Sequence, residues 1–186
     1  MKSALLVIDV QQSFTRRPYW DEEELPGFID RLNRLIERAQ ARGIPVVQVF
    51  HVDETDDPAD VFSKQSGLIR SLPQLRIEPA AVFYKSVHSA LFANTADGVG
   101  LDYWLRKRGI DRLIVTGIRT EQCCETTTRH ASDLGYQVSY ASDATLTFPM
   151  VSASGRRFTP AEIRERTELV LAGRFAEIVA AESVSL

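Results

Sequence analysis

Three residue types suited to hydrolytic chemistry stand at the ends of apolar runs in this sequence. Asp9 ends one run, Lys85 ends another, and Cys123 follows a third after a short turn. A cysteine supplies a nucleophile, a carboxylate can carry its proton, and a lysine lowers the pKa of both groups by its positive charge. The combination indicates acyl transfer or hydrolysis through a covalent thioester, provided that the fold brings the three side chains together.

The cysteine is expected at the start of a helix. The segment from Leu113 to Thr128 is predicted as a strand, a turn at Gly117 and a helix that Gly135 ends. Backbone N–H groups and the dipole at a helix N-terminus favour negative charge, so we expect the Cys123 thiol to be held partly as thiolate. The alternative is that Cys123 and Cys124 are inert fillers of a buried helix. Since one residue rotates a helical side chain by about 100°, only one of the pair can face the strand ends, and we expect Cys123.

The composition indicates one globular domain covering residues 1–186. The chain is 44% hydrophobic and 25% charged, with a net charge of −3. It has no basic run with interleaved aromatic residues, so nucleic acid is not an expected partner. Adjacent cysteines are poorly placed to form a disulfide, which fits a reducing compartment. No apolar span of about 18 residues and no signal-like N-terminus is present, so we expect a cytoplasmic protein without membrane contact.

Strands and helices alternate along the chain. Strands are predicted at Ala4–Ile8, Pro45–Phe50, Ala80–Tyr84, Leu113–Val115, Tyr136–Tyr140 and Ala176–Ala180. Helices are predicted at Phe28–Ala39, Asp97–Arg108, Cys123 to Gly135 and, from a capping box, Thr159 to Ala172. Two irregular segments are predicted as binding loops, Asp53–Pro79 with a short helix near Ser66–Leu72, and Thr147–Phe158.

This order predicts an α/β fold, a three-layer α/β/α arrangement with a six-stranded, mostly parallel, doubly wound sheet. Ligands bind at the carboxyl ends of the strands in such sheets. Asp9 ends the first strand, Lys85 ends the third and Cys123 opens the helix after the fourth, so we expect the three residues at one edge. Taken singly, Asp9 could instead cap a turn, and Lys85 could be a surface charge.

Three separated motifs resemble the isochorismatase-like cysteine hydrolases over roughly residues 4–182. They are Asp9–Phe14; Lys85 with Ser89–Phe92 and Thr95; and Gly117–Cys123 with Thr127, Gly135, Tyr136, Asp143 and Ala144. The resemblance implies an α/β/α fold and a catalytic triad of Asp9, Lys85 and Cys123. It also implies a cis peptide at Ile118–Arg119, with the backbone N–H groups of Arg119 and Cys123 forming an oxyanion hole. Family members are usually homo-oligomers, so the same is expected here.

We therefore expect hydrolysis of a small-molecule amide C–N bond through a thioester. The alternative within the family is hydrolysis of a vinyl ether such as isochorismate, with Asp9 as general acid and no need for a cysteine. A nucleotide-dependent oxidoreductase or binding module would need a Gly-rich turn after the first strand, which is absent. A scaffold without catalysis is disfavoured by the intact Asp, Lys and Cys set. A Cys-His pair using His88 or His130 remains a rival.

Candidate substrate contacts are Phe14, Trp20, Arg119 and Phe148. Arg119 stands where the family commonly has a small residue, and its guanidinium could seat an anionic or strongly polar group of the substrate, with Arg156 or Arg157 helping. The alternative is an outward-pointing arginine paired with Glu121 or Glu125.

No metal or other cofactor is expected. The zinc-binding Asp-x-His-Pro-x-x-His pattern of nicotinamidases, which are also cysteine hydrolases of this kind, is absent. His51 is followed only by scattered acids between Asp53 and Asp60. Neither EF-hand spacing nor a second histidine is present, so these acids are interpreted as a solvated loop.

Overall fold

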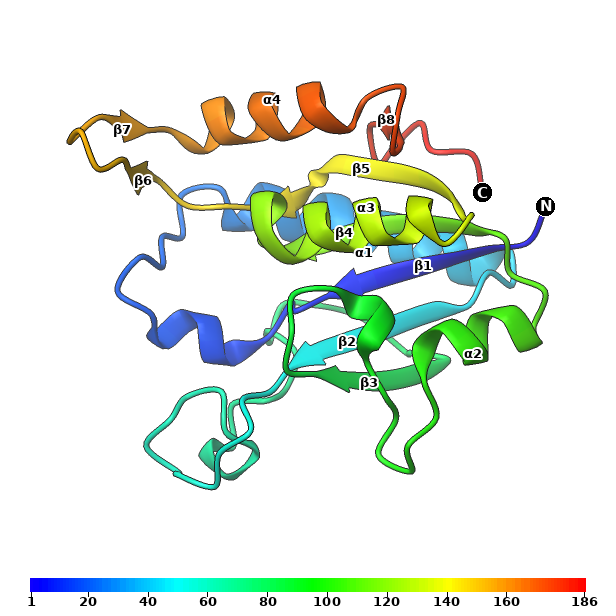
Figure 1. Cartoon of the computed structure of the whole chain (residues 1–186), viewed down its shortest axis with the longest axis horizontal. Coiled ribbons are helices and arrows are strands. Elements are labelled where there is room, and N and C mark those ends of the chain that lie inside the picture. The colour runs from blue at the N-terminus through cyan, green and yellow to red at the C-terminus, as the bar shows by residue number, and fades with distance from the viewer.

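The computed structural model describes residues 1–186 and confirms the three-layer α/β/α fold (Figure 1). One six-stranded sheet has the order β3-β2-β1-β4-β5-β8, and every neighbouring pair is parallel. The strands are β1 (Ser3–Ile8), β2 (Val46–His51), β3 (Ala81–Lys85), β4 (Arg112–Ile118), β5 (Gln137–Leu146) and β8 (Glu177–Val179). The order reverses between β1 and β4, which places the expected ligand-binding edge at the carboxyl ends of the central strands.

Both faces of the sheet are covered, which explains why its strands are continuous apolar runs. In β1, Leu5 and Val7 pack in one core cluster with α1 (Leu25–Ala41), while Leu6 and Ile8 pack in the other. The second cluster includes residues of α2 (Leu101–Lys107) and α3 (Glu125–Asp133). Figure 1 shows α1 behind the sheet and α2 and α3 in front of it.

The last helix, α4 (Pro160–Leu171), starts at the predicted capping box. Thr159 Oγ1 accepts from the Glu162 amide, and the Glu162 carboxylate accepts from the Thr159 amide. Two backbone donors at the helix start are thereby satisfied. Ile163, Thr167 and Leu171 form its buried stripe.

Two predicted boundaries are wrong for reasons visible in the backbone. Helix α2 begins at Leu101, four residues after the predicted Asp97, because Gly98 has φ of +86° and Gly100 is the extended N-cap. Strand β5 does not end at Tyr140 but continues to Leu146, beside β4, after a register shift between Val115 and Gly117.

The two irregular segments contain little regular structure. The helix predicted near residues 66–72 is only a 3₁₀ turn, Lys64–Ser66, which Gly67 ends with φ of +71°. Residues 147–158 contain an antiparallel hairpin of β6 (Met150–Val151) and β7 (Arg157–Phe158). The hairpin projects from the body at the left of Figure 1.

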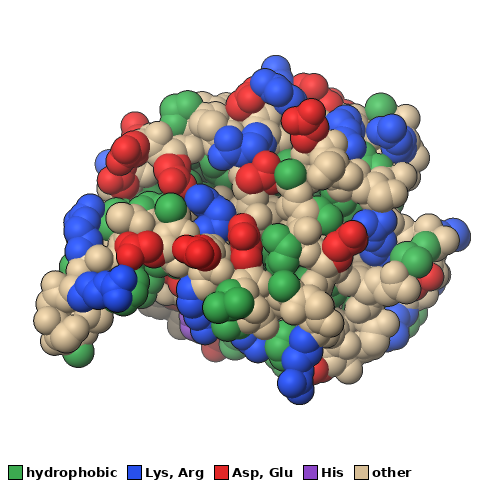
Figure 2. Space-filling model, turned by 90° about the horizontal axis from the view of Figure 1, so that it is seen from above, with side chains coloured by type: hydrophobic (Ala, Val, Ile, Leu, Met, Phe, Trp, Pro, Cys, Tyr) green, Lys and Arg blue, Asp and Glu red, His purple; other side chains and the backbone are tan.

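None of the helices combines the length and apolar character needed to cross a bilayer. In Figure 2, seen from above relative to Figure 1, acidic and basic side chains are interspersed over the visible face.

Candidate active site

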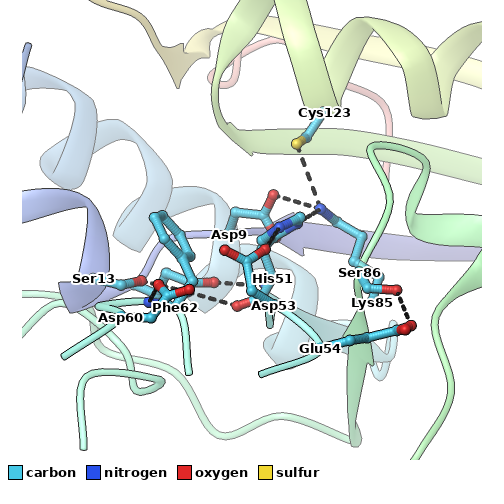
Figure 3. Close-up of polar contacts among 11 residues, drawn as sticks. Asp9, Ser13, His51, Asp53, Glu54, Asp60, Phe62, Lys85, Ser86 and Cys123 are labelled. Carbon is cyan, nitrogen blue, oxygen red and sulfur yellow. Dashed lines mark hydrogen bonds and ion pairs between the residues drawn. The ribbon is translucent and has the colours of Figure 1, made fainter. Parts of the chain in front are cut away.

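Asp9, Lys85 and Cys123 meet at the carboxyl edge of the sheet, as their positions at strand ends predict (Figure 3). Lys85 Nζ donates to Asp9 Oδ2 at 2.7 Å and to Cys123 Sγ at 3.4 Å. The side chains of Asp9 and Lys85 are fully buried, and Cys123 is 6% exposed. Lys85 is therefore no surface charge. Its long side chain reaches past the end of β2 to a carboxylate on one side and a thiol on the other.

The backbone around Asp9 is tightly constrained. Asp9 has φ of +55°, in the left-handed region that non-glycine residues seldom adopt and that is found at functional sites. Gly117 on the neighbouring β4 has φ of +127°, and a Cβ there would lie 2.0 Å from the Ile8 carbonyl oxygen. The two strands therefore approach so closely beside Asp9 that only glycine fits at position 117.

The turn that carries the nucleophile differs from the predicted simple helix start. The Ile118–Arg119 peptide bond is cis, as the family resemblance implied. A π-helical turn, η4 (Thr120–Cys124), follows, so Cys123 lies in a wide turn before α3. Two buried hydrogen bonds hold this turn to β5: Tyr140 donates to the Thr120 carbonyl at 2.9 Å, and the Thr120 and Thr145 hydroxyls are 2.8 Å apart.

The expectation that the Cys123 thiol is held partly as thiolate is wrong. Burial raises the pKa of the Cys123 thiol well above its ordinary value, the Asp9 carboxylate raises it further, and Lys85 opposes both only in part. Lys85 stays charged, because Asp9 and Cys123 raise its pKa although burial lowers it. The cluster at rest is thus a carboxylate, an ammonium and a neutral thiol. Asp9 Oδ1 is buried and without a hydrogen-bond partner, so it is available to accept the thiol proton.

Cys124, His88 and His130 form no hydrogen bond with the cluster of Asp9, Lys85 and Cys123. Cys124 is fully buried, and burial raises its pKa. His130 Nδ1 lies 2.8 Å from the Ser89 hydroxyl, and His88 has no hydrogen bond to the three clustered residues. Neither rival base is therefore paired with Cys123.

His51 is the neighbour that sequence reasoning missed. Its Nδ1 is 3.3 Å from Lys85 Nζ, and its Nε2 is 3.0 Å from Asp53 Oδ1 (Figure 3). The signal in the sequence is its position directly after a predicted strand, Pro45–Phe50, at the edge where Asp9 and Lys85 are also expected; that β2 lies between the strands carrying those two residues is seen only in the structure. The sequence pattern around His51 raises only the question of a metal ligand.

An open cleft of about 870 Å³ lies beside the cluster, over the ends of β2 and β3 and the start of α3. Its charged and polar lining comes from both irregular and regular segments: Asp53, Glu54, Thr55, Asp56, Lys64, Lys85, Ser86, His88, Ser89, Asn94 and Thr126. The cleft is large enough for a small organic molecule.

The four predicted substrate contacts fall into two groups, neither of which lines this cleft. Phe14 packs edge-on against Phe62, with ring centroids 5.1 Å apart. Trp20 and Phe148 pack together with their ring centroids 5.2 Å apart, and Cζ of the Arg119 guanidinium lies 5.7 Å from the centroid of the Phe148 ring.

Arg119 is buried, and its guanidinium pairs with Glu121 at 2.8 Å. The pairing is the predicted alternative, but the side chain does not point outward. Arg156, predicted to help Arg119 bind an anionic group, forms an ion pair with Glu162. No group of three or more His, Cys, Asp or Glu side chains is arranged to hold a metal ion.

Comparison with known proteins gives one consistent result. The sequence profile of the isochorismatase domain matches residues 3–172. The chain is 47% identical to the isochorismatase family protein YwoC of Bacillus subtilis, over 79% of each chain. It is 36% identical to nicotinamidase 3 of Arabidopsis thaliana, over 95% of this chain and 84% of that one. The crystal structure of an isochorismatase from Pseudomonas putida superposes with a TM-score of 0.81 at 26% identity, covering 98% of this chain and 90% of the other.

Proposed function

This chain belongs to the isochorismatase family of hydrolases, and we propose that within it the protein is a cysteine-dependent amidohydrolase that cleaves a C–N bond of a small molecule. The observation that carries the proposal is the buried cluster in which Lys85 donates to both Asp9 and Cys123. Similarity to a nicotinamidase, whose name denotes an amide substrate, supports the reaction class.

In the first half-reaction the neutral thiol needs a base as it attacks. Asp9 Oδ1 takes the thiol proton while Cys123 Sγ forms a bond to the substrate carbonyl carbon. The resulting oxyanion is held by the backbone N–H groups of Arg119 and Cys123. Asp9 then returns the proton to the amide nitrogen of the substrate and the C–N bond breaks. The amine departs, and the acyl group remains on Cys123 as a thioester.

In the second half-reaction water replaces the amine. Asp9 accepts a proton from water as the water oxygen attacks the thioester carbonyl and forms a tetrahedral intermediate. Collapse of this intermediate breaks the C–S bond. The thiolate takes the proton back from Asp9, and a carboxylic acid is released. Lys85 keeps the carboxylate and the transient thiolate beside one positive charge throughout, so the low-dielectric site never holds an unpaired anion.

The thiol separates this reaction from the family's vinyl-ether hydrolysis. A general acid suffices for a vinyl ether, whereas attack on an unactivated amide needs a nucleophile. Here the cysteine contacts the ammonium and lies beside a carboxylate oxygen that is free to accept its proton. These features favour the amide.

We also propose Arg119, with Phe14, Trp20 and Phe148, as contributors to substrate recognition. Arg119 lies between Glu121 and aromatic rings, with its Nε buried and unpartnered. A polar substrate group that reaches Nε would complete its hydrogen bonds. Arg119→Ala is expected to raise KM for an anionic substrate more than for its neutral analogue. Equal effects on both would assign Arg119 a structural role.

A homo-oligomer is proposed on the family resemblance and on exposed apolar side chains of the hairpin and α4. Val151 is 65% exposed and Leu169 is 77% exposed. Light scattering after size exclusion tests the proposal, with Leu169→Glu expected to shift the mass towards the monomer.

A hydrolysis screen tests the proposed activity. Small amides, ureides and nitriles, together with isochorismate, are incubated with the wild-type protein and with Cys123→Ala. We expect turnover of at least one amide or ureide that Cys123→Ala lacks. Hydrolysis of isochorismate alone, retained by Cys123→Ala, would assign the vinyl-ether reaction instead.

A further inference from the structure

The Lys85 ammonium has three N–H donors, and the structure supplies three acceptors. Two are Asp9 Oδ2 and Cys123 Sγ, the groups of the proposed mechanism. The third is His51 Nδ1 at 3.3 Å. A buried lysine whose three donors are all engaged is fixed in direction, since rotation about its last bond would break three contacts together.

This contact determines the hydrogen position on the His51 ring. An ammonium cannot accept a hydrogen bond, so Nδ1 must present its lone pair to Lys85. The ring hydrogen of the neutral imidazole is then on Nε2, where it donates to Asp53 Oδ1 at 3.0 Å. Asp53 thereby selects the tautomer that Lys85 requires.

The surroundings of His51 hold the ring in place. Its backbone N–H donates to Gln11 Oε1 at 2.8 Å, and its carbonyl accepts from Gln11 Nε2 at 3.0 Å. The Phe62 ring packs edge-on against the imidazole, with centroids 5.5 Å apart. The Asp53 amide donates to the Phe62 carbonyl at 3.0 Å, which ties the carboxylate-bearing residue to the same segment. The ring therefore has little freedom to turn away from Lys85.

The charged and titratable groups around His51 are few. Lys85 faces Nδ1 from β3 and Asp53 faces Nε2 from the loop after β2, while Asp9 and Cys123 lie beyond Lys85 (Figure 3). The hydrogen bonds between Asp53 and His51 and between His51 and Lys85 thus connect the wall of the open cleft with the buried carboxylate and thiol.

We propose that His51, oriented by Asp53, is a positioning residue that holds the Lys85 ammonium against both Asp9 and Cys123. The proposal rests on the proposed roles of Asp9, Lys85 and Cys123, and it assigns His51 no contact with the substrate. Without the third acceptor, Lys85 loses one of the three contacts that direct it and stabilises the Cys123 thiolate less well.

The test measures the alkylation rate of Cys123 by iodoacetamide, which needs no substrate, in three variants of His51. His51→Leu removes both nitrogen atoms. His51→Asn keeps an acceptor near the position of Nδ1, and His51→Gln places its amide nearer to Nε2. Because hydrogen bonds to charged groups are the stronger ones, we expect His51→Leu to slow alkylation by about tenfold and His51→Asn to recover most of that loss. His51→Gln is expected to resemble His51→Leu.

A matched control is available at His130, whose Nδ1 also makes one side-chain hydrogen bond but to Ser89. His130→Leu is expected to leave the alkylation rate of Cys123 within about twofold of wild type, as for substitutions outside a contact network. Thermal melts of all variants, together with the Asn rescue, separate a lost acceptor from general loosening of the fold.

Asp53 gives an independent arm. Asp53→Ala alone is expected to slow alkylation, but the double variant with His51→Leu should be no slower than His51→Leu, because Asp53 acts through the ring. If the two substitutions slowed alkylation additively, the claim that Asp53 acts through His51 would be overturned. Alkylation of His51→Leu at the wild-type rate, or of His51→Asn no faster than His51→Leu, would overturn the positioning role.

The outcome is separable from the proposed function. If no amide is turned over but the His51 series behaves as predicted, the positioning of Lys85 stands and the proposed reaction falls. If Cys123-dependent turnover is found but the His51 variants retain wild-type alkylation and kcat, the reaction stands and the inference falls.

Discussion

Replacing Asp9 by Asn is expected to separate the reactivity of Cys123 from turnover. The buried cluster is electrically neutral as Asp9 carboxylate, Lys85 ammonium and Cys123 thiol. In Asp9→Asn the ammonium remains without its anion, and only the thiolate form of Cys123 makes the cluster neutral. The pKa of Cys123 should therefore fall, because the carboxylate that helps to raise it is gone.

The size of the effect follows from the distances. At an effective dielectric constant of about 20, an ammonium 3.4 Å from Sγ attracts a thiolate by about 5 kcal/mol. In the wild type Asp9 offsets much of this attraction. If the thiolate gains about 3 kcal/mol, its population rises roughly a hundredfold. Since a less basic thiolate is also a weaker nucleophile, the alkylation rate at neutral pH should rise only about tenfold.

Turnover should move in the opposite direction. Without a carboxylate, nothing carries the proton to the leaving nitrogen, and kcat should fall by about 10²-fold or more. The assay pairs iodoacetamide labelling at Cys123, followed by peptide mass spectrometry, with hydrolysis of the substrate found in the screen. A thermal melt accompanies both, because an uncompensated buried charge costs about 3–5 kcal/mol of a total stability of about 5–15 kcal/mol. Alkylation and turnover that fall together in a folded variant would refute this reasoning.

The remaining predictions concern neighbouring features. Lys85→Met should slow Cys123 alkylation, opposite to Asp9→Asn, and should lower stability by about 3–5 kcal/mol in a thermal or urea melt, because Asp9 is left buried and unpaired. Unchanged stability would contradict the buried ion pair. In the wild type, alkylation of Cys123 should rise about tenfold per pH unit without a plateau below pH 9.0, because thiolate is the reactive form and its pKa is raised above that ordinary value. A plateau near neutral pH would mean a resting thiolate. Gly117→Ala should cost more than about 3 kcal/mol, since its Cβ would meet the Ile8 carbonyl, whereas Gly155→Ala, with φ of +82° and open space, should cost about 1–2 kcal/mol. Similar losses at both glycines would refute the close approach of β1 and β4. Prolonged EDTA treatment should leave turnover intact, because no group of three metal-ligating side chains is present, and recovery of a lost activity by zinc would refute this expectation.

The fold was predictable from the sequence because the apolar runs are local. Strands buried on both faces, such as β1, appear as unbroken runs, and the capping box before α4 marks its start. Boundaries were less predictable where backbone conformation decided them. The positive φ at Gly98 delays α2, and pairing with β4 extends β5 beyond its alternating stretch.

The proximity of Asp9, Lys85 and Cys123 was predictable from topology, but their protonation was not. A helix start suggests a field that favours thiolate, whereas the pKa of Cys123 is governed by burial and by a carboxylate distant in sequence. His51 was missed because a strand-end histidine carries no local sign of the lysine that will face it. The pairing of Arg119 with Glu121 is one of the two predicted alternatives, but its burial among aromatic rings depends on Tyr19 and Phe148, which are far apart in the sequence.

The central claim is that hydrolysis passes through a thioester on Cys123, and peptide mass spectrometry after rapid acid quenching tests it directly. Wild-type protein is mixed with a turned-over amide, quenched during the steady state and digested. We expect an added mass equal to the acyl portion of the substrate on the peptide that contains Cys123, removed by hydroxylamine and absent from Cys123→Ala. Steady turnover with no acyl adduct on that peptide, together with retained activity in Cys123→Ala, would contradict the account.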